Sequence, residues 1–248
     1  MEEKLYTIPL NDAINEQDEC PLCVVRRNIE HDLIDYVLGP GASYMESDTR
    51  ADTDREGFCR QHFKMMFDYG NALGNAWILK THYKKTIEEM NEAIKMFSAP
   101  KNRLFGKSGG NDAVSDWIAG REKSCYICRR TDETYERYLD TFFILYKKDI
   151  SFREKLEESK GFCLHHLRDV CSAAAKKLDD KQKAEFYPVI FKLMQDNMQR
   201  VQDDISWFVE KFDYIHTNDP WKNSRDAIQR GMQKLESGYP ADPVYKNK

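Results

Sequence analysis

Apolar residues recur every three or four positions through most of the chain, which is the spacing of amphipathic helices. The first clear run predicts a helix over 21–38 and consists of Val25, Ile29, Leu33, Tyr36 and Val37. Gly39 and Pro40 end this helix, because glycine accepts a positive φ and proline cannot continue the hydrogen-bond ladder. Residues 1–19 carry no such run, and we interpret them as a polar lead-in.

The pattern then changes to a polar stretch followed by a long helical run. Residues 43–56 are polar and charged, so we expect an exposed loop there. From Cys59 to Phe97 the spacing predicts one long helix, with apolar positions at Phe63, Met66, Phe67, Leu73, Trp77, Ile87, Met90 and Ile94. Gly70 and Gly74 lie one turn apart inside this run, and we interpret them as sites of close helix packing.

The second half repeats the helical spacing. After Cys128 the apolar residues predict a helix, and a shorter charged helix is expected over 151–159. A further helix begins at Cys163, and a break near Asp179 follows it. The cleanest apolar stripe of the chain then predicts a long helix with one buried face; it consists of Tyr187, Ile190, Phe191, Met194, Met198, Val201, Ile205, Phe208 and Phe212. A last helix is expected over 225–237.

These elements predict an all-α fold, a helical bundle built from two pseudo-repeats. We assign residues 1–97 to the first repeat, 98–116 to a linker, 117–216 to the second repeat and 217–248 to a C-terminal helix and tail. Because the apolar stripes are wide, we expect the two repeats to pack against each other as one fused body.

Composition narrows the class of protein. The 248 residues are 41% hydrophobic and 32% charged, with a net charge of −4. We find no apolar run of the ~20 residues that would cross a bilayer, and the acidic N-terminus lacks the core of a signal peptide. The sequence therefore predicts a cytoplasmic protein without a membrane partner. The acidic balance argues against nucleic acid, which attracts basic surfaces.

Candidate chemistry is concentrated in a four-ligand motif that occurs twice. Each copy is a CxxC pair followed by GFCxxH, and the two copies are offset by 105 residues at the first cysteine and 104 at the third. Paired CxxC motifs in a reducing compartment are typical of metal ligands. We predict that each repeat closes its own Cys3His site, with one site from Cys20, Cys23, Cys59 and His62, and the other from Cys125, Cys128, Cys163 and His166.

Zinc is the metal that we favour, because Cys3His is an established tetrahedral zinc set that leaves no open position. Two ions are expected, each holding two helix starts together. An iron–sulfur cluster is the weaker alternative, since thiolates also hold clusters. Arginines follow both CxxC pairs, and they are placed either to offset the negative charge of the sites or simply on an exposed helix surface; they are Arg26, Arg27, Arg129 and Arg130.

Histidine and cysteine residues outside the motif have simpler interpretations. His165 competes with His166 as a ligand, but register with His62 and the i, i+3 relation to Cys163 select His166. Cys171 has no counterpart in the first repeat and is expected to be a buried apolar residue.

The motifs CPLC, GFCxxH, CxIC and GFCxxH, followed by a PWxxSxxAI segment from Pro220, resemble a bacterial family known only as a domain of unknown function. The similarity covers residues 17–238. It implies a bacterial cytoplasmic protein in which the eight ligand positions are family features, and it implies no activity, substrate or partner.

Three classes of function fit the sequence. The first is a zinc-stabilised helical protein, acting as a binding or scaffold protein for another protein or a small-molecule ligand. The second is a thiol-redox or metal-sensing protein whose CxxC pairs release metal on oxidation. The third is an enzyme with a pocket between the repeats, for which His82, His165, His216 and the tyrosines are the candidate polar groups. No spacing picks out a nucleophile or an acid–base pair, so the sequence favours a protein that is not an enzyme.

Overall fold

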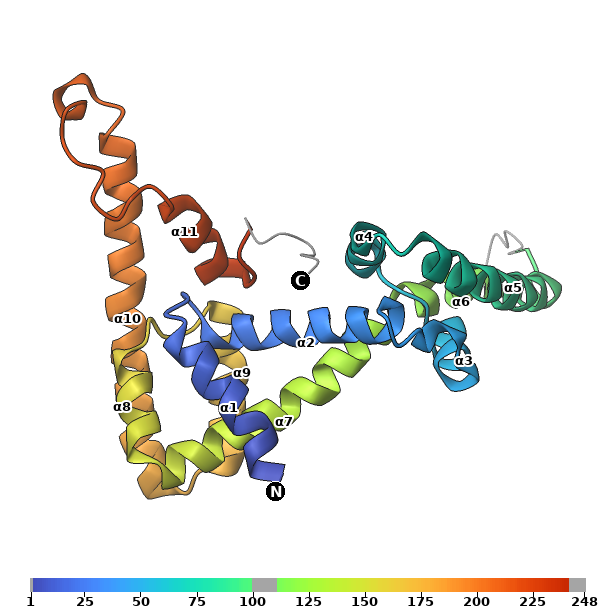
Figure 1. The fold of residues 1–248 in the computed structure, drawn as a ribbon, viewed down its shortest axis with the longest axis horizontal. Coiled ribbons are helices and arrows are strands. Elements are labelled where there is room, and N and C mark those ends of the chain that lie inside the picture. Colours follow the sequence, from blue (N-terminus) through green and yellow to red (C-terminus); the bar gives the residue numbers. More distant parts are fainter. Residues whose placement is uncertain (1, 100–110, 241–248) are drawn as a thin grey trace, which may run out of the picture. The chain divides into compact units, whose positions relative to one another are not determined.

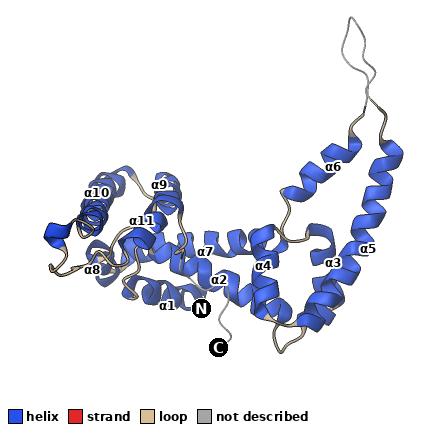
Figure 2. Cartoon of the chain, turned by 90° about the horizontal axis from the view of Figure 1, so that it is seen from above, coloured by secondary structure: helices blue, strands red, loops and turns tan. Residues whose placement is uncertain are grey.

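The computed structural model describes residues 2–99 and 111–240, and the regular structure of this part is helical (Figure 2). Its only β-type feature is an isolated bridge between Ser98 and Asn111. The predicted all-α class is confirmed. Part of the predicted linker, residues 100–110, and part of the predicted tail, residues 241–248, lie outside the described residues.

The chain divides into two compact units (Figure 1). Among the described residues, unit 1 comprises 2–29 and 134–240, and unit 2 comprises 30–99 and 111–133. The divisions fall inside α2 (Pro21–Leu38) and α7 (Tyr126–Lys148), so each of these helices supplies one end to each unit. The units therefore have different boundaries from the two sequence repeats, because the helix that follows each CxxC is shared.

Unit 1 contains the ends of α2 and α7 together with α1 (Glu2–Asn15), α8 (Ile150–Glu158), α9 (Leu164–Lys177), α10 (Asp180–Glu210), the 3-10 helix η2 (Tyr214–His216) and α11 (Ala227–Glu236). Its core is rich in aromatic rings packed edge to face. Phe142 contacts Phe143, Phe152 and Phe162 with ring centroids 5.1–6.1 Å apart. All of these side chains are fully buried, so this cluster joins α7, α8 and the segment that leads into α9.

Unit 2 contains the other ends of α2 and α7 together with the 3-10 helix η1 (Ser43–Met45), α3 (Ser47–Glu56), α4 (Arg60–Tyr69), α5 (Ala72–Met96) and α6 (Ala113–Glu122). Its core gathers apolar side chains from the end of α2, from α4 and from the start of α7. Helices α3 and α6 pack against α5. The buried members of the core are Ile34, Val37, Leu38, Phe58, Met65, Met66, Ile78, Cys125, Tyr126 and Ile127.

Several predicted elements agree with the structure. Helix α2 has the predicted bounds, and α8, α9 and α11 begin within two residues of their predicted starts; α10 begins directly after the predicted break near Asp179. The predicted stripe is only partly buried: Ile190, Met194 and Val201 are inside, whereas Phe191 is 46% exposed and Phe212, beyond the end of α10, is 74% exposed.

Three predictions of local structure are wrong. Residues 2–15 form α1, whose short apolar face of Leu10, Ala13 and Ile14 is buried. The expected loop at 43–56 contains η1 and α3. Helix α3 was not predicted because the residues that it buries, such as Thr49 and Thr53, have no large apolar side chains.

The long helix expected from Cys59 to Phe97 is two helices. Gly70, with φ of 84°, ends α4 in the left-handed conformation, and Asn71 caps α5 by accepting a hydrogen bond from the Gly74 amide at 2.9 Å. The close packing expected at Gly74 is present, since a β-carbon there would lie 3.0 Å from the Leu38 side chain.

Candidate metal centres

The eight predicted ligands gather into two groups of four. The first site consists of Cys20, Cys23, Cys163 and His166, and lies within unit 1. The second site consists of Cys59, His62, Cys125 and Cys128, and lies within unit 2. In each group the four ligand atoms lie within 4.8 Å of one another.

The spacing of the ligand atoms fits one tetrahedral ion. Zinc bonds of ~2.3 Å to sulfur and ~2.0 Å to nitrogen place sulfurs about 3.8 Å apart and sulfur and nitrogen about 3.5 Å apart. In the first site Cys23 Sγ lies 3.8 Å from Cys163 Sγ, and His166 Nδ1 lies 3.2–3.4 Å from three sulfurs. The second site has similar distances. Cys59 Sγ lies 3.9 Å from Cys128 Sγ, and His62 Nδ1 lies 3.2–3.4 Å from the three sulfurs of its group. All seven cysteines are free, so no disulfide competes with metal binding.

The predicted partition of the ligands between the sites is wrong, because each CxxC meets the CxxH of the other repeat. The reason is the length of the shared helices. The 18 residues of α2 advance about 27 Å, which carries the chain away from Cys23. The expected return loop is instead η1 and α3, and the following α4 packs beside the end of α2, where Tyr69 donates a hydrogen bond to Asp35 at 2.9 Å. Likewise, the 23 residues of α7 advance about 35 Å before α9 begins.

Each site joins two helix starts, as the sequence predicts. Cys59 and Cys163 are the N-terminal caps of α4 and α9, with nearly equal backbone angles. Cys20 and Cys125 directly precede α2 and α7. The N-terminus of a helix carries partial positive charge, so four helix starts stabilise the thiolates of the two sites.

A glycine two residues before each capping cysteine is required by the backbone. Gly57 has φ of 63° and Gly161 has φ of 74°, a region that residues with a β-carbon rarely adopt. Both glycines are also closely packed. A β-carbon at Gly57 would lie 2.8 Å from the His82 ring, and one at Gly161 would lie 3.0 Å from Met194 Sδ.

In each of the two sites, the surroundings of one cysteine favour its thiolate form. Hydrogen bonds from Cys20 and Cys23 outweigh burial and lower the pKa of Cys163 to about 4. A hydrogen bond from Cys128, opposed by burial and aided by His62, lowers the pKa of Cys125 to about 3. Burial disfavours the imidazolium of His62, yet Cys125 and Glu30 raise its pKa to about 10. Metal binding at the second site must therefore displace the proton of His62.

Two residues that sequence reasoning missed lie against the ligating imidazoles. The outer nitrogen of His62, Nε2, lies 3.8 Å from the carboxylate of Glu30, which is an ion-pair distance and too long for a hydrogen bond. The ring of Tyr135 lies 5.5 Å from that of His166. Glu30 and Tyr135 both follow the second cysteine of a CxxC pair by seven residues, and this shared spacing of two helical turns was the available signal.

The arginines after the CxxC pairs interact mainly with other side chains. Arg26 lies over the Tyr135 ring at 5.3 Å, and Arg27 pairs with Glu16 at 3.6 Å. Arg129 donates to Glu56 at 2.6 Å and to Glu133 at 2.7 Å. Arg130 is exposed.

A buried charged network that includes Lys234 of α11 holds the first site. Lys234, 1% exposed, reaches from α11 to the backbone on both sides of the site. Glu19, directly before Cys20, pairs with Arg200 at 2.6 Å and with Arg230 at 3.5 Å. After α11, the Gly238 amide lies 3.4 Å from Cys23 Sγ. Helix α11 thus fixes both segments that deliver ligands to this site.

The remaining histidines have separate surroundings. His165 is partly exposed and lies 3.6 Å from Asp169, so His166 alone supplies a nitrogen to the four-ligand group. His165, His166 and Asp169 also lie close together, but His166 already belongs to the first site. His82 in unit 2 is in contact with Arg121 at 3.0 Å, and His216 in unit 1 pairs with Asp219 at 2.8 Å. Cys171 is half-buried rather than buried.

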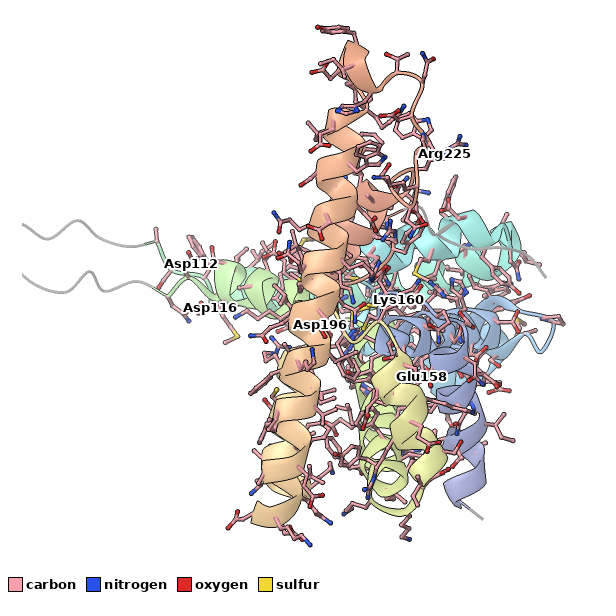
Figure 3. All side chains as sticks on the ribbon, turned by 90° about the vertical axis from the view of Figure 1, so that its left-hand side faces the viewer. Asp112, Asp116, Glu158, Lys160, Asp196 and Arg225 are labelled. Atoms are coloured by element: carbon pink, nitrogen blue, oxygen red, sulfur yellow. The ribbon has the colours of Figure 1, made fainter. Side chains whose placement is uncertain are left out.

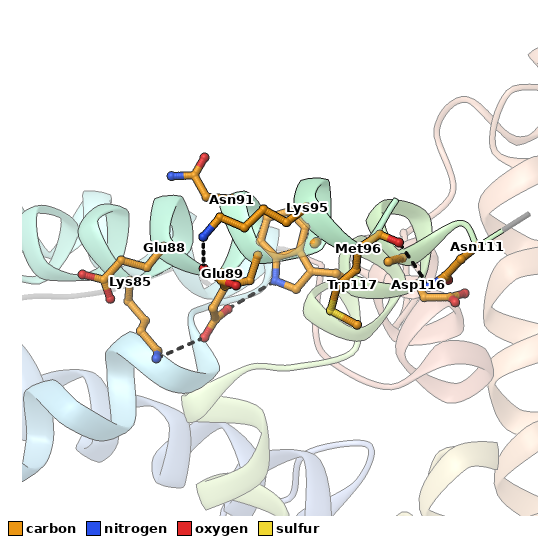
Figure 4. A pocket seen from close by; sticks show the side chains of 12 residues that line it. Lys85, Glu88, Glu89, Asn91, Lys95, Met96, Asn111, Asp116 and Trp117 are labelled. Atoms are coloured by element: carbon orange, nitrogen blue, oxygen red, sulfur yellow. Dashed lines mark hydrogen bonds and ion pairs between the residues drawn. The ribbon is translucent and has the colours of Figure 1, made fainter. Parts of the chain in front are cut away.

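Two surface cavities are lined by charged side chains. One, of about 660 Å³, lies between α5 and α6, where Glu89 accepts a hydrogen bond from Trp117 and pairs with Lys85 (Figure 4). The other, of about 870 Å³, lies in unit 1, and Figure 3 labels Glu158, Lys160, Asp196 and Arg225 from its lining. Neither cavity is lined by a cysteine or a histidine.

Fold and site together define a class: an all-α protein with two Cys3His groups, each able to hold a metal ion. Residues 1–242 match the model of the "Family of unknown function (DUF6062)", and the chain belongs to that family. No curated protein and no solved structure matches the chain. No helix in the described part combines the length and apolar composition of a bilayer-spanning segment.

Proposed function

We propose that this chain is a zinc-stabilised cytoplasmic protein that acts as a binding or scaffold protein, with one zinc ion in each four-ligand site. The observation that carries the proposal is the closure of the sites. Three sulfurs and one imidazole nitrogen converge at tetrahedral spacing, so the protein fills every coordination position. A filled site has no position for a substrate or an activated water, which favours a structural ion over a catalytic one.

The proposed ions stabilise the fold by joining residues that are distant in sequence. Cys20 and Cys163 are 143 positions apart, and Cys59 and Cys125 are 66 apart. Zinc contributes on the order of 10 kcal/mol of folding free energy in zinc-finger peptides. Thiolate ligands must be reduced, which fits the cytoplasm.

Elemental analysis of the purified chain tests this proposal. We expect two zinc ions per chain and no absorption in the visible range. Iron at either site, with charge-transfer bands, would contradict the assignment of zinc. Full helicity and an unchanged melting temperature after complete removal of metal would contradict the structural role.

A second candidate, a thiol-redox or metal sensor, is favoured by one difference between the sites. All four ligands of the first site are buried, whereas Cys59 and Cys128 in the second site are half-buried. Accessible thiolates react faster with oxidants. We expect one equivalent of hydrogen peroxide to release zinc from the second site first. Retention of both ions at this dose would exclude a sensor function.

A further inference from the structure

The outer face of α5 carries an apolar stripe with the heptad spacing of a coiled coil. Counted from Leu73, the steps are 3, 4, 3, 4, 3, 4 and 3, which are those of alternating a and d positions. The stripe consists of Leu73, Ala76, Lys80, Tyr83, Ile87, Met90 and Ile94 on α5 together with Phe97, the C-terminal cap of the helix, and all eight are exposed. The opposite face of α5 carries its buried residues, Gly74, Ile78 and Ala93, and the helix packs against α3 and α6. This helix is therefore apolar on both sides.

The exposed apolar area of the stripe is large enough to form an interface with a partner. Six large apolar side chains are between 36% exposed, at Met90, and 64% exposed, at Leu73. If each contributes roughly 80–100 Å², two copies of the stripe bury roughly 1,000 Å² in total, which reaches the lower size of a specific interface. A stripe this long requires a helix as its partner.

The stripe is complementary to itself in antiparallel orientation. We align the two helices so that the numbers of any two facing residues add to 170. The layers that form are Leu73 with Phe97 of the second copy, Ala76 with Ile94, Lys80 with Met90, and Tyr83 with Ile87. Each layer occurs twice around a two-fold axis, as in an isologous dimer. A parallel pair would instead place Lys80 against Lys80 of the second copy, which repel each other.

Lys84 and Glu88, beside the stripe, are four positions apart on α5, so their charges are neighbours on the same helix and the seam residues alone set the register. Lys80, at a seam position, already lies over the Trp77 ring at 4.8 Å, and its long side chain can reach solvent from there.

We propose that the chain forms a homodimer through the outer face of α5, paired antiparallel with α5 of a second copy. This inference goes beyond the proposed zinc-stabilised fold and names the partner as the chain itself. It requires only α5 of unit 2. The dimer holds two chains by one helix each, which suits a scaffold protein.

The test is sedimentation velocity of the zinc-loaded full chain over a range of concentrations. We expect a reversible dimer. The variant I87E/I94E places carboxylates in the seam and raises the dimer dissociation constant at least a hundredfold. The matched control is Ile150→Glu, an isoleucine on α8 that is 71% exposed, and it leaves dimerisation unchanged. Helicity and two zinc ions per chain verify that each variant is folded. A monomer at all concentrations, or a dimer that I87E/I94E leaves intact, overturns the proposal and assigns the stripe to another protein or to another segment of the chain.

Discussion

Lys234 and Glu19 are joined at two points: the buried ammonium donates to the Glu19 carbonyl oxygen at 2.6 Å and lies 3.3 Å from its carboxylate. The same ammonium lies 3.5 Å from the carbonyl oxygen of Phe162. Glu19 and Phe162 directly precede Cys20 and Cys163. One side chain from α11 therefore sets the distance between two ligands of the first site.

Lys234→Met tests this arrangement. The substitution preserves the apolar stem but removes the charge, so the free energy of unfolding falls by about 3 kcal/mol, as is usual when one partner of a buried ion pair is lost. We expect the first site to lose zinc to a chelator faster, while the second site is unaffected. Lys192→Met, at an exposed ion pair on α10, is the control and changes stability by less than about 0.5 kcal/mol. Equal effects at both sites would contradict the account.

Gly57→Ala and Gly161→Ala test the turns that precede the capping cysteines. Both glycines have positive φ and lie within 3.0 Å of a neighbouring side chain once a β-carbon is added. We expect each substitution to cost about 1–3 kcal/mol of unfolding free energy, measured by denaturant titration of the zinc-loaded chain. Gly120→Ala is the matched control, because this glycine lies in α6 with open space around it. There alanine stabilises by about 0.5–1 kcal/mol. A neutral Gly57→Ala would be inconsistent with the structure.

Glu30→Gln tests the carboxylate beside His62. At 3.8 Å this carboxylate pairs with the imidazole without a hydrogen bond, so we expect its loss to weaken metal affinity by a factor nearer ~10 than the ~100 of a hydrogen-bonded partner. We expect this loss at the second site only, measured by competition with a chromogenic chelator. Tyr135→Phe, at the equivalent position on α7, is the comparison. Its buried hydroxyl has no hydrogen-bond partner within the described structure, so its removal leaves affinity at the first site unchanged. Equal loss from both variants would show that the carboxylate has no special effect.

Zinc affinity at the second site depends on pH with a definite sign. The pKa of His62 is raised to about 10, and hydrogen bonding with Cys125, together with burial, raises the pKa of Cys128 as well. In the metal-free protein, protonation of His62 makes its full contribution to the stability of the fold below pH ~6.5. This contribution is lost as the pH rises through about 10. Near neutral pH zinc must displace at least these two protons. We expect the affinity to fall about a hundredfold for each unit of pH decrease between pH 8 and 6. An affinity independent of pH over this range would rule out the competition.

The sequence predicted the helices where the apolar spacing was strong and missed them where the buried face was small or polar. Residues 21–38 were predicted with correct bounds because valine, isoleucine and leucine recur along one face. Helix α3 was missed because it buries Thr49 and Thr53, which have no strong apolar signal. The break at Gly70 was missed because the apolar spacing continues across it; only the left-handed glycine and the Asn71 cap mark the end.

The ligands were predictable, but their partners were not. Residue type and spacing identified all eight side chains, and the i, i+3 relation selected His166 over His165. Nothing in the spacing distinguishes closure within a repeat from exchange between repeats, because both give two identical Cys3His sets. The answer depends on the lengths of α2 and α7, which carry the chain too far for a direct return. Lys234 was also missed, since its contacts join residues 215 positions apart.

Each CxxC pair lies with the CxxH of the other repeat in one four-ligand site. Zinc stoichiometry of two double variants, measured after a brief challenge with a strong chelator, tests this exchange of ligands between the repeats. In C20A/C163A both substitutions fall in the first site, so one tightly held zinc per chain is expected. In C20A/C59A each site loses a ligand, so none is expected. The reverse outcome, with one zinc kept by C20A/C59A and none by C20A/C163A, would contradict the account and return the ligands to their own repeats.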